Sequence, residues 1–236
     1  MPCFGLGIKR FFKARNIELQ IGKKFDWLKG IPGGGMDKKA FFNELAVGWD
    51  QRFYSPELKE PLPKLVSLFR LKIGSEVLDV GAGTGGIIPY LLEAIGLEGS
   101  VWAIDFAEEM VKVGKKKFLG EDRVSFEIAS VESLPYEKGV FDHVVCFGAF
   151  PHFVDQPRAL KEMGRVLKPR GTLIIAHALS SAEIRHHHQN CAPVSQDFLP
   201  DEPQMRSLLE EAGFQLKRLI DKPKCYLVEG VKESHP

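Results

Sequence analysis

A glycine-rich turn directly follows an apolar segment that contains an acidic residue. Residues 77–85 are Val-Leu-Asp-Val-Gly-Ala-Gly-Thr-Gly, which predicts a buried strand that runs into a tight turn. Because Gly81, Gly83 and Gly85 lack a Cβ, the backbone can approach a ligand closely there. A helix starting near Thr84 would add unpaired N–H groups at its positive end. The segment therefore predicts a site for a nucleotide-like molecule.

The glycine spacing alone leaves two kinds of ligand open. Gly81, Gly83 and Gly86 also satisfy G-x-G-x-x-G, and Asp105 follows about 20 residues later, as in a site for NAD. Asp79 separates the alternatives, because its carboxylate would repel a pyrophosphate and attract a cationic amino group. S-adenosylmethionine carries such an amino group, and its ribose hydroxyls can donate hydrogen bonds to Asp105. The carboxylates therefore favour S-adenosylmethionine over NAD.

Two histidines are candidate catalytic bases. His152 lies in the sequence Phe-Pro-His-Phe, and His177 lies near the end of a predicted strand at 171–178. Both lie at the carboxyl ends of predicted strands, where open α/β sheets place their sites. An imidazole can take up a proton near neutral pH, and the alternative is that each ring hydrogen-bonds a loop backbone.

Residues 180–200 form a long connection that we predict to be a lid over the substrate, since connections beyond about 12–15 residues are often functional. We expect His188 and Cys191 to contact the substrate. Together with His177, the lid also offers a set of potential metal ligands, namely His186, His187, His188, Cys191 and Asp197. Consecutive histidines on a helix point about 100° apart, so the set favours a polar lid and we predict no metal.

The remaining pattern predicts how these residues are positioned. Apolar residues at helical spacing from Asp37 predict a leading helix that carries Trp49 and Tyr54, with a second helix near 62–70. Strands and helices then alternate, which indicates a parallel sheet covered on both faces. The predicted strands are 75–80, 100–105, 123–128, 141–148 and 171–178, and the helices between them are 84–95, 107–118 and 156–167. A helix at 202–212 and a hairpin of strands 214–220 and 224–231 close the chain, so the last strand is antiparallel to its neighbour.

Composition is consistent with one domain preceded by a basic extension. Residues 1–35 hold seven Lys or Arg against two acidic residues, which leaves 25 basic and 29 acidic residues in 36–236. An acidic domain gives no electrostatic footprint for nucleic acid. The extension is either a poorly ordered tail or a short basic amphipathic helix. Ile31-Pro-Gly-Gly-Gly separates it from Met36, which could be an alternative start.

The four cysteines lie far apart, and no apolar stretch reaches the 18 residues that a membrane span requires. We therefore expect reduced thiols, a cytoplasmic location and no transmembrane segment. Nothing in the sequence indicates the oligomeric state.

With these features located, residues from about 40 to 231 resemble the class I S-adenosylmethionine-dependent methyltransferases. The resemblance is strongest to the branch with ubiquinone/menaquinone C-methyltransferases and many small-molecule enzymes. Five segments agree in order with the family's motifs: Val77 to Gly85, Ala103-Ile-Asp105, Leu134-Pro-Tyr136, Phe141-Asp-His-Val144 and Arg165-Val-Leu-Lys-Pro-Arg-Gly171. In the last of these Arg170 replaces a glycine. The resemblance implies an α/β, Rossmann-like sheet of seven strands in the order 3-2-1-4-5-7-6, with strand 7 antiparallel and helices on both faces.

The resemblance also implies roles for individual residues. Asp79 and the backbone of Gly81 to Gly85 would hold the methionine part of the cofactor, and Asp105 would bind the ribose. Ser130 stands where relatives commonly carry an Asp that accepts a hydrogen bond from adenine, and Glu132 could compensate for the missing charge. The full set of expected cofactor-binding residues is Asp79, Gly81, Ala82, Gly83, Thr84, Gly85, Asp105, Phe106, Met110, Ser130, Val131, Glu132 and Phe147.

The implied activity is transfer of a methyl group from S-adenosylmethionine to a small-molecule acceptor, with release of S-adenosylhomocysteine. In relatives the leading helix folds over the cofactor, so Trp49 and Tyr54 are expected at the substrate, and the alternative, above all for Trp49, is packing in the core. One alternative is a non-catalytic S-adenosylmethionine-binding sensor or partner subunit. Another is an enzyme acting on a thiol-bound metalloid such as arsenite, with Cys146 and Cys191 near the site.

Overall fold

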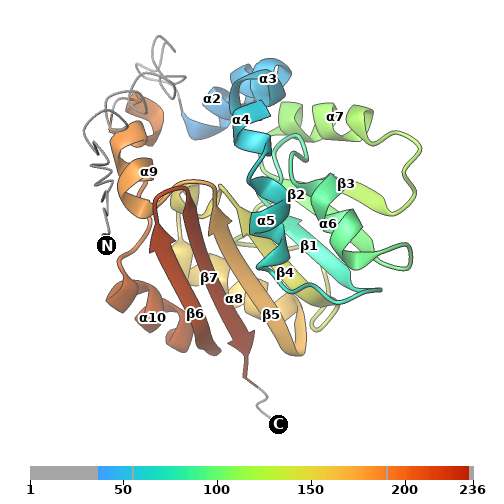
Figure 1. Ribbon diagram of the computed structural model, residues 1–236, viewed down its shortest axis with the longest axis vertical. Helices are drawn as coiled ribbons and strands as arrows, with labels where there is room; N and C mark the ends of the chain where they lie inside the picture. Colours follow the sequence, from blue (N-terminus) through green and yellow to red (C-terminus); the bar gives the residue numbers. More distant parts are fainter. Residues whose placement is uncertain (1–36, 55, 190, 234–236) are drawn as a thin grey trace, which may run out of the picture.

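The computed structural model describes residues 37–54, 56–189 and 191–233. Segment 1–35, which the sequence predicts to be a basic extension, and Met36 lie outside these residues. Seven strands form one sheet in the order β3-β2-β1-β4-β5-β7-β6 (Figure 1), so the predicted strand order is confirmed. The pairs from β3 to β5 are parallel, and β7 runs antiparallel to both β5 and β6.

The strands of the sheet are β1 (Glu76–Val80), β2 (Ser100–Asp105), β3 (Val124–Ile128), β4 (Phe141–Phe147), β5 (Leu167–His177), β6 (Phe214–Lys222) and β7 (Cys225–Lys232). The α-helices are α2 (Lys38–Leu45), α3 (Trp49–Phe53), α4 (Pro56–Lys59), α5 (Leu62–Ser67), α6 (Ile88–Ile95), α7 (Glu108–Lys117), α8 (Gln156–Val166), α9 (Ser181–His188) and α10 (Glu202–Glu211). Short 3₁₀ turns lie at η1 (Ala46–Gly48), η2 (Phe150–His152) and η3 (Ala192–Val194).

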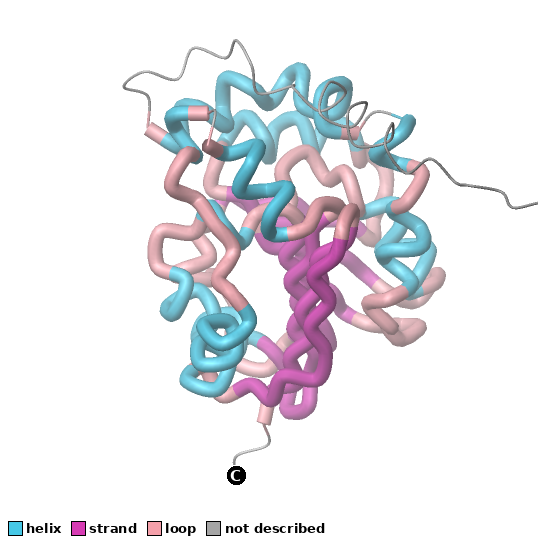
Figure 2. The backbone as a smooth tube through the Cα atoms, turned by 60° about the vertical axis from the view of Figure 1, so that its left-hand side comes forward, coloured by secondary structure: helices cyan, strands magenta, loops and turns pink. Residues whose placement is uncertain are grey.

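Helices cover both faces of the sheet because its central strands are apolar on both sides. In β4, the residues Val144, Val145 and Cys146 are all fully buried. On one face α8 and α10 pack over β1, β4 and β5, and on the other face α5, α6 and α7 pack over β1, β2 and β4. Figure 2 shows the strands between these two layers of helices. None of the helices in the described part of the chain combines the length and apolar character that a membrane span needs.

A third apolar cluster lies at the carboxyl ends of the parallel strands, where α2, α3 and α9 gather at the top of Figure 1. It joins Phe41, Phe42 and Leu45 of α2 to Met110 of α7 and to Val194 after α9. Segments that are distant in sequence therefore cover the end of the sheet where α/β folds bind ligands.

The predicted leading helix is divided into α2, η1 and α3, and Tyr54 follows the end of α3. Two predicted element starts are also wrong by four residues. Helix α6 begins at Ile88, not near Thr84, because Gly85 has φ 77° and so stands in a left-handed conformation that a right-handed helix cannot contain. Strand β5 begins at Leu167, four residues before the predicted start, because Leu167 already pairs with Phe141 of β4. The irregular stretch that follows includes Arg170 with φ 63°, at the position where relatives carry glycine.

Candidate active site

A cavity of about 350 Å³ opens at the carboxyl ends of the parallel strands. It is lined by most residues that the sequence predicts for the site: Trp49, Tyr54, Asp79, Gly81, Ala82, Gly83, Asp105, Phe106, Met110, Ser130, Val131, Glu132, Phe147, His152, His177 and His188. Thr84, Gly85 and Cys191 are not among its lining residues. The Thr84 hydroxyl instead donates a hydrogen bond to Asp50 Oδ1 at 2.5 Å, and the residue is fully buried.

Asp79 lies in this cavity as a buried carboxylate without a partner. Its exposed fraction is 1%, and neither oxygen has a hydrogen-bond partner among the described residues. Burial, together with the charge of Asp105, raises the pKa of Asp79 to about 7. A buried carboxylate is costly unless something pairs with it, so the site is suited to a ligand that brings a cationic group.

Asp105 ends the neighbouring strand, and its carboxylate organises the turn. Oδ2 accepts a hydrogen bond from the N–H of Gly83 at 2.9 Å, and Oδ1 accepts one from the N–H of Ala107 at 2.9 Å. Burial raises the pKa of Asp105, although these backbone hydrogen bonds oppose the shift. A carboxylate offers about four acceptor positions, so Asp105 retains capacity for ribose hydroxyls.

The glycine turn allows neighbouring chains to approach as closely as they do. Gly81 has φ 68°, and a Cβ there would lie 2.3 Å from Cβ of Ala149. A Cβ on Gly86 would lie 1.9 Å from Cζ of Tyr54. Because Gly86 has no side chain, Tyr54 of the leading segment can pack directly against the turn.

Aromatic rings form the wall opposite the sheet. Trp49 stacks on Phe53 with centroids 3.9 Å apart, and Phe42 meets Phe106 edge-on at 5.8 Å and the ring of His152 at 5.2 Å. Such a wall suits flat apolar groups. Sequence reasoning missed Phe42 as a site residue, because helical spacing marks the buried face of a helix without showing whether that face meets core or cavity.

Ser130 and Glu132 act together at the edge of the cavity. The Ser130 hydroxyl donates to the Glu132 carboxylate, and Glu132 Oε1 also accepts the N–H of Val154 at 3.3 Å. A carboxylate thus lies beside the residue that replaces the family's usual Asp. That Glu132 compensates for the missing charge stays a prediction.

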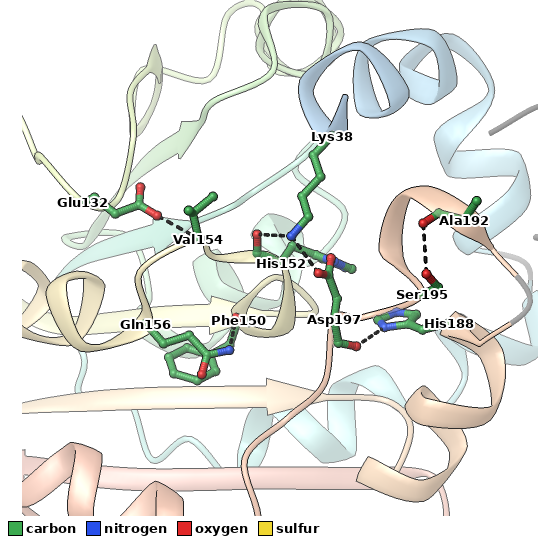
Figure 3. A network of polar contacts seen from close by, with 10 residues as sticks. All are labelled: Lys38, Glu132, Phe150, His152, Val154, Gln156, His188, Ala192, Ser195 and Asp197. Carbon is green, nitrogen blue, oxygen red and sulfur yellow. Dashed lines mark hydrogen bonds and ion pairs between the residues drawn. The ribbon is translucent and has the colours of Figure 1, made fainter. Parts of the chain in front are cut away.

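A polar network surrounds His152, which lines the cavity (Figure 3). His152 Nδ1 lies 2.8 Å from Asp197 Oδ2, and Lys38 Nζ lies 2.6 Å from Asp197 Oδ1. Lys38 also donates to the backbone carbonyl of His152 at 3.3 Å. The network joins α2, the loop after β4 and the segment after α9, and it leaves Asp197 only 6% exposed.

The other two histidines of the cavity are also anchored through Nδ1. His188 Nδ1 lies 2.6 Å from the backbone carbonyl of Asp197, and the rings of His188 and His152 are 5.0 Å apart. His177 Nδ1 accepts the N–H of Leu179 at 3.1 Å. Burial, reinforced by the other histidines, lowers the pKa of His177 to about 3 and that of His188 to about 4.

Cys146 and Cys191 stand apart from this network. Cys146 is fully buried in the core, and Cys191 is buried in the third apolar cluster. Neither lines the cavity, so the described residues offer no thiol there to a metalloid acceptor. Within the described residues, no three His, Cys, Asp or Glu side chains are grouped so that they could hold a metal ion.

Comparison with known proteins agrees with this geometry. A family model described as a methyltransferase domain matches residues 78–175, the stretch from β1 to β5. A solved S-adenosylmethionine-dependent methyltransferase from Aquifex aeolicus superposes with a TM-score of 0.63 at 27% identity, over 83% of this chain and 99% of that one. The chain belongs to the class I S-adenosylmethionine-dependent methyltransferases.

Two relatives of this methyltransferase carry curated names. The demethylmenaquinone methyltransferase of Staphylococcus haemolyticus is 29% identical over 61% of this chain and 70% of its own length. The ubiquinone/menaquinone biosynthesis C-methyltransferase of Neisseria meningitidis is 38% identical over 47% of this chain. The chain matches only 45% of the length of the second protein. A methyltransferase from Haloferax volcanii, solved in complex with an activator, shares the fold with a TM-score of 0.69 at 21% identity, over 84% of this chain and 99% of that one.

S-adenosylmethionine is the cosubstrate of this methyltransferase, and the residues of the cavity fit it. The unpartnered carboxylate of Asp79 matches a cationic amino group. Asp105 matches ribose hydroxyls, and the Phe106 ring offers an apolar surface for adenine.

Proposed function

We propose that the protein transfers a methyl group from S-adenosylmethionine to a small aromatic acceptor and releases S-adenosylhomocysteine. The observation that supports this most strongly is that one cavity combines an unpartnered buried carboxylate, Asp79, with a wall of aromatic rings and histidines. The first feature suits the cofactor, and the second suits an apolar acceptor with a polar edge.

Bound cofactor supplies an electrophilic methyl group on a sulfonium, so the protein has mainly to bind, align and exclude water. On this proposal Asp79 and the turn from Gly81 to Gly85 hold the amino acid part, and Asp105 holds the ribose. Phe106, Met110 and Val131 pack on adenine, while Ser130 and Glu132 accept from its amino group.

The acceptor would occupy the rest of the cavity. Phe42, Trp49 and Phe153 make that part strongly apolar. One named relative is a demethylmenaquinone methyltransferase, and the other is a ubiquinone/menaquinone biosynthesis C-methyltransferase. We therefore propose a quinol or related aromatic compound, contacted by Trp49, Tyr54 and His188. The 180–200 segment would serve as the lid, and His152 or His177 would act as the catalytic base.

A non-catalytic binding role is less well supported. The cavity extends from the glycine turn to three histidines, and a protein that only sensed the cofactor would not need this additional space. We also propose that the enzyme works in the cytoplasm, since Cys146, Cys191 and Cys225 are free thiols.

The test begins with calorimetric titration of S-adenosylmethionine into wild-type protein and Asp79→Ala, with NAD as the control ligand. We expect micromolar binding that is lost in Asp79→Ala, and no binding of NAD. Equal affinity in wild type and variant would overturn the assignment of the cofactor site.

Turnover is then measured as S-adenosylhomocysteine release with reduced naphthohydroquinone, phenols, amines and thiols as acceptors. A methylated aromatic product, identified by mass, is expected. Tight cofactor binding with no transfer to any of these acceptors would instead favour the non-catalytic role.

A further inference from the structure

The hydrogen bonds of the three cavity histidines determine which ring nitrogen carries a proton. The Asp197 carbonyl near His188 Nδ1 can only accept, so His188 Nδ1 carries the proton. The Leu179 amide near His177 Nδ1 can only donate, so His177 Nδ1 holds a lone pair. Because burial keeps both rings neutral, Nε2 of His188 is an acceptor and Nε2 of His177 is a donor.

His152 is oriented by a carboxylate. Burial acts to raise the pKa of Asp197, but hydrogen bonds from His152 and Lys38 outweigh it, so the pKa of Asp197 is lowered and the carboxylate is ionised. It therefore accepts a hydrogen bond from the N–H at Nδ1 of His152, with 2.8 Å between Nδ1 and Asp197 Oδ2. In the part of the chain that the structure describes, Nε2 of His152 has no hydrogen-bond partner, and the ring lines the cavity.

Lys38 fixes this arrangement from the other side. Its ammonium binds Asp197 Oδ1 at 2.6 Å and the backbone carbonyl of His152 at 3.3 Å. Asp197 is thereby held with one oxygen on Lys38 and the other on His152. A carboxylate that orients an imidazole through Nδ1 and stabilises its protonated form is the arrangement that makes histidine an effective base.

We propose that His152 Nε2 accepts the proton of a hydroxyl group on the aromatic acceptor, and that Asp197 is the positioning residue that makes this possible. The inference rests on the proposed function and narrows the acceptor to hydroxyl-bearing aromatic compounds. The O–H bond of the acceptor breaks, its electron pair stays on the oxygen, and the proton forms the N–H bond of an imidazolium paired with Asp197. His177 supplies the complementary N–H donor in the same cavity.

The tautomers of the three cavity histidines favour a ligand with a hydroxyl group over a metal ion. A metal held by the three rings would need three lone pairs directed at it, whereas His177 presents an N–H from Nε2. The cavity thus offers a lone pair on His188, an N–H donor on His177 and, in the neutral form that the proposal requires, a second lone pair on His152. This set suits a ligand that both donates and accepts hydrogen bonds.

The test uses para-nitrophenol, whose phenolate absorbs visible light and whose neutral form does not. The probe is added to full-length protein saturated with S-adenosylhomocysteine, at a pH where the free probe is mostly neutral. Absorbance reports ionisation of the bound probe, and calorimetry reports how much is bound. The variants are His152→Gln and Asp197→Asn, each matched by a control: His186→Gln, exposed on α9, and Asp122→Asn, exposed before β3.

Wild type and both controls are expected to bind the probe as phenolate. The ionised fraction of bound probe should fall about tenfold in His152→Gln and Asp197→Asn, because the proton acceptor or the charge that stabilises it is lost. Unchanged affinity for S-adenosylhomocysteine would show that both variants are folded. A merely structural role for Asp197 would alter how much probe binds, not its ionised fraction.

The inference is overturned if wild type binds the probe in its neutral form, if Asp197→Asn ionises it as wild type does, or if wild type binds no phenol. Zinc that binds stoichiometrically to wild type and not to His177→Gln would also overturn it, in favour of a metal site. Ionisation requires no methyl transfer, so phenolate formation without turnover would leave this inference standing while the proposed function failed.

Discussion

Asp79 and Asp105 lie near the carboxyl ends of the adjacent strands β1 and β2 and line one cavity, but only Asp105 has hydrogen-bond partners among the described residues. The N–H groups of Gly83 and Ala107 satisfy Asp105. Both oxygens of Asp79 are buried without a partner, so a cationic group of a ligand gains more binding free energy beside Asp79 than beside Asp105. Both are acidic residues at strand ends, but Asp105 is already hydrogen-bonded by the protein, whereas Asp79 still lacks a partner that a ligand could supply.

Cofactor binding should depend on pH through Asp79. Because its pKa is about 7 without ligand, Asp79 must lose a proton before it can pair with an ammonium group. Affinity for S-adenosylmethionine should rise up to tenfold per pH unit on approaching pH 7, with proton release on binding. It should weaken above roughly pH 8, where the free ligand's α-amino group deprotonates.

This pH dependence is measured by calorimetry across pH in two buffers of different ionisation enthalpy. Asp79→Asn is the control, and it should bind weakly, with no proton release. A flat affinity below pH 7 in wild type would contradict the role given to Asp79.

The same carboxylate should destabilise the cofactor-free protein. The folded pKa of Asp79 is raised, so the folded state loses stability as pH rises from the unfolded value, about 4, to about 7. Asp79→Asn should therefore increase the free energy of unfolding at pH 8 by on the order of 2–4 kcal/mol.

Urea unfolding of both proteins at several pH values measures this difference. It should vanish below about pH 4, where Asp79 is neutral in both states. Saturating S-adenosylmethionine should stabilise wild type far more than the variant. A variant less stable than wild type at pH 8 without cofactor would refute the account.

Gly86 should be coupled to Tyr54 by contact. A Cβ at Gly86 falls 1.9 Å from the Tyr54 ring, so Gly86→Ala must displace Tyr54 from the cavity, at a cost of about 1–3 kcal/mol in unfolding free energy. Adding Tyr54→Ala should remove most of that cost, which a double-mutant cycle measures. Gly48→Ala is the control, since its new Cβ would meet only Arg52 Nε, at 3.6 Å. Additive effects of the two substitutions would exclude the steric coupling.

Lys38 should hold the segment after α9 in place. Lys38→Met leaves the buried Asp197 without its cation, which should destabilise that segment by about 1–2 kcal/mol. Hydrogen exchange of peptides covering 180–199 should then become roughly tenfold faster, while α8 is unaffected. Lys39→Met is the matched control, because Lys39 pairs with the exposed Glu108. Equal exchange in the two variants would show that Lys38 does not restrain the segment.

The sequence determined the features that depend on neighbours along the chain. A glycine turn after an apolar strand, with Asp79 before it and Asp105 at the end of the next strand, places both carboxylates in one site because parallel strands end at one edge. Alternation of strands and helices, and the closing hairpin, predicted a parallel sheet with an antiparallel last strand, whereas the strand order came from the family resemblance. The wrong start of α6 shows the limit, since the left-handed Gly85 is set by the packing of the turn.

Only the tertiary structure decided the surroundings of His152. Asp197 is 45 residues after it and Lys38 is 114 residues before it, and no periodicity relates such distant positions. Their meeting depends on how α2 and the segment after α9 pack on the loop after β4. In the same way, only packing put Cys191 into an apolar cluster and His188, three residues earlier, at the cavity. Local sequence specifies turns and strand ends, whereas contacts between distant segments follow from the packing of the whole chain.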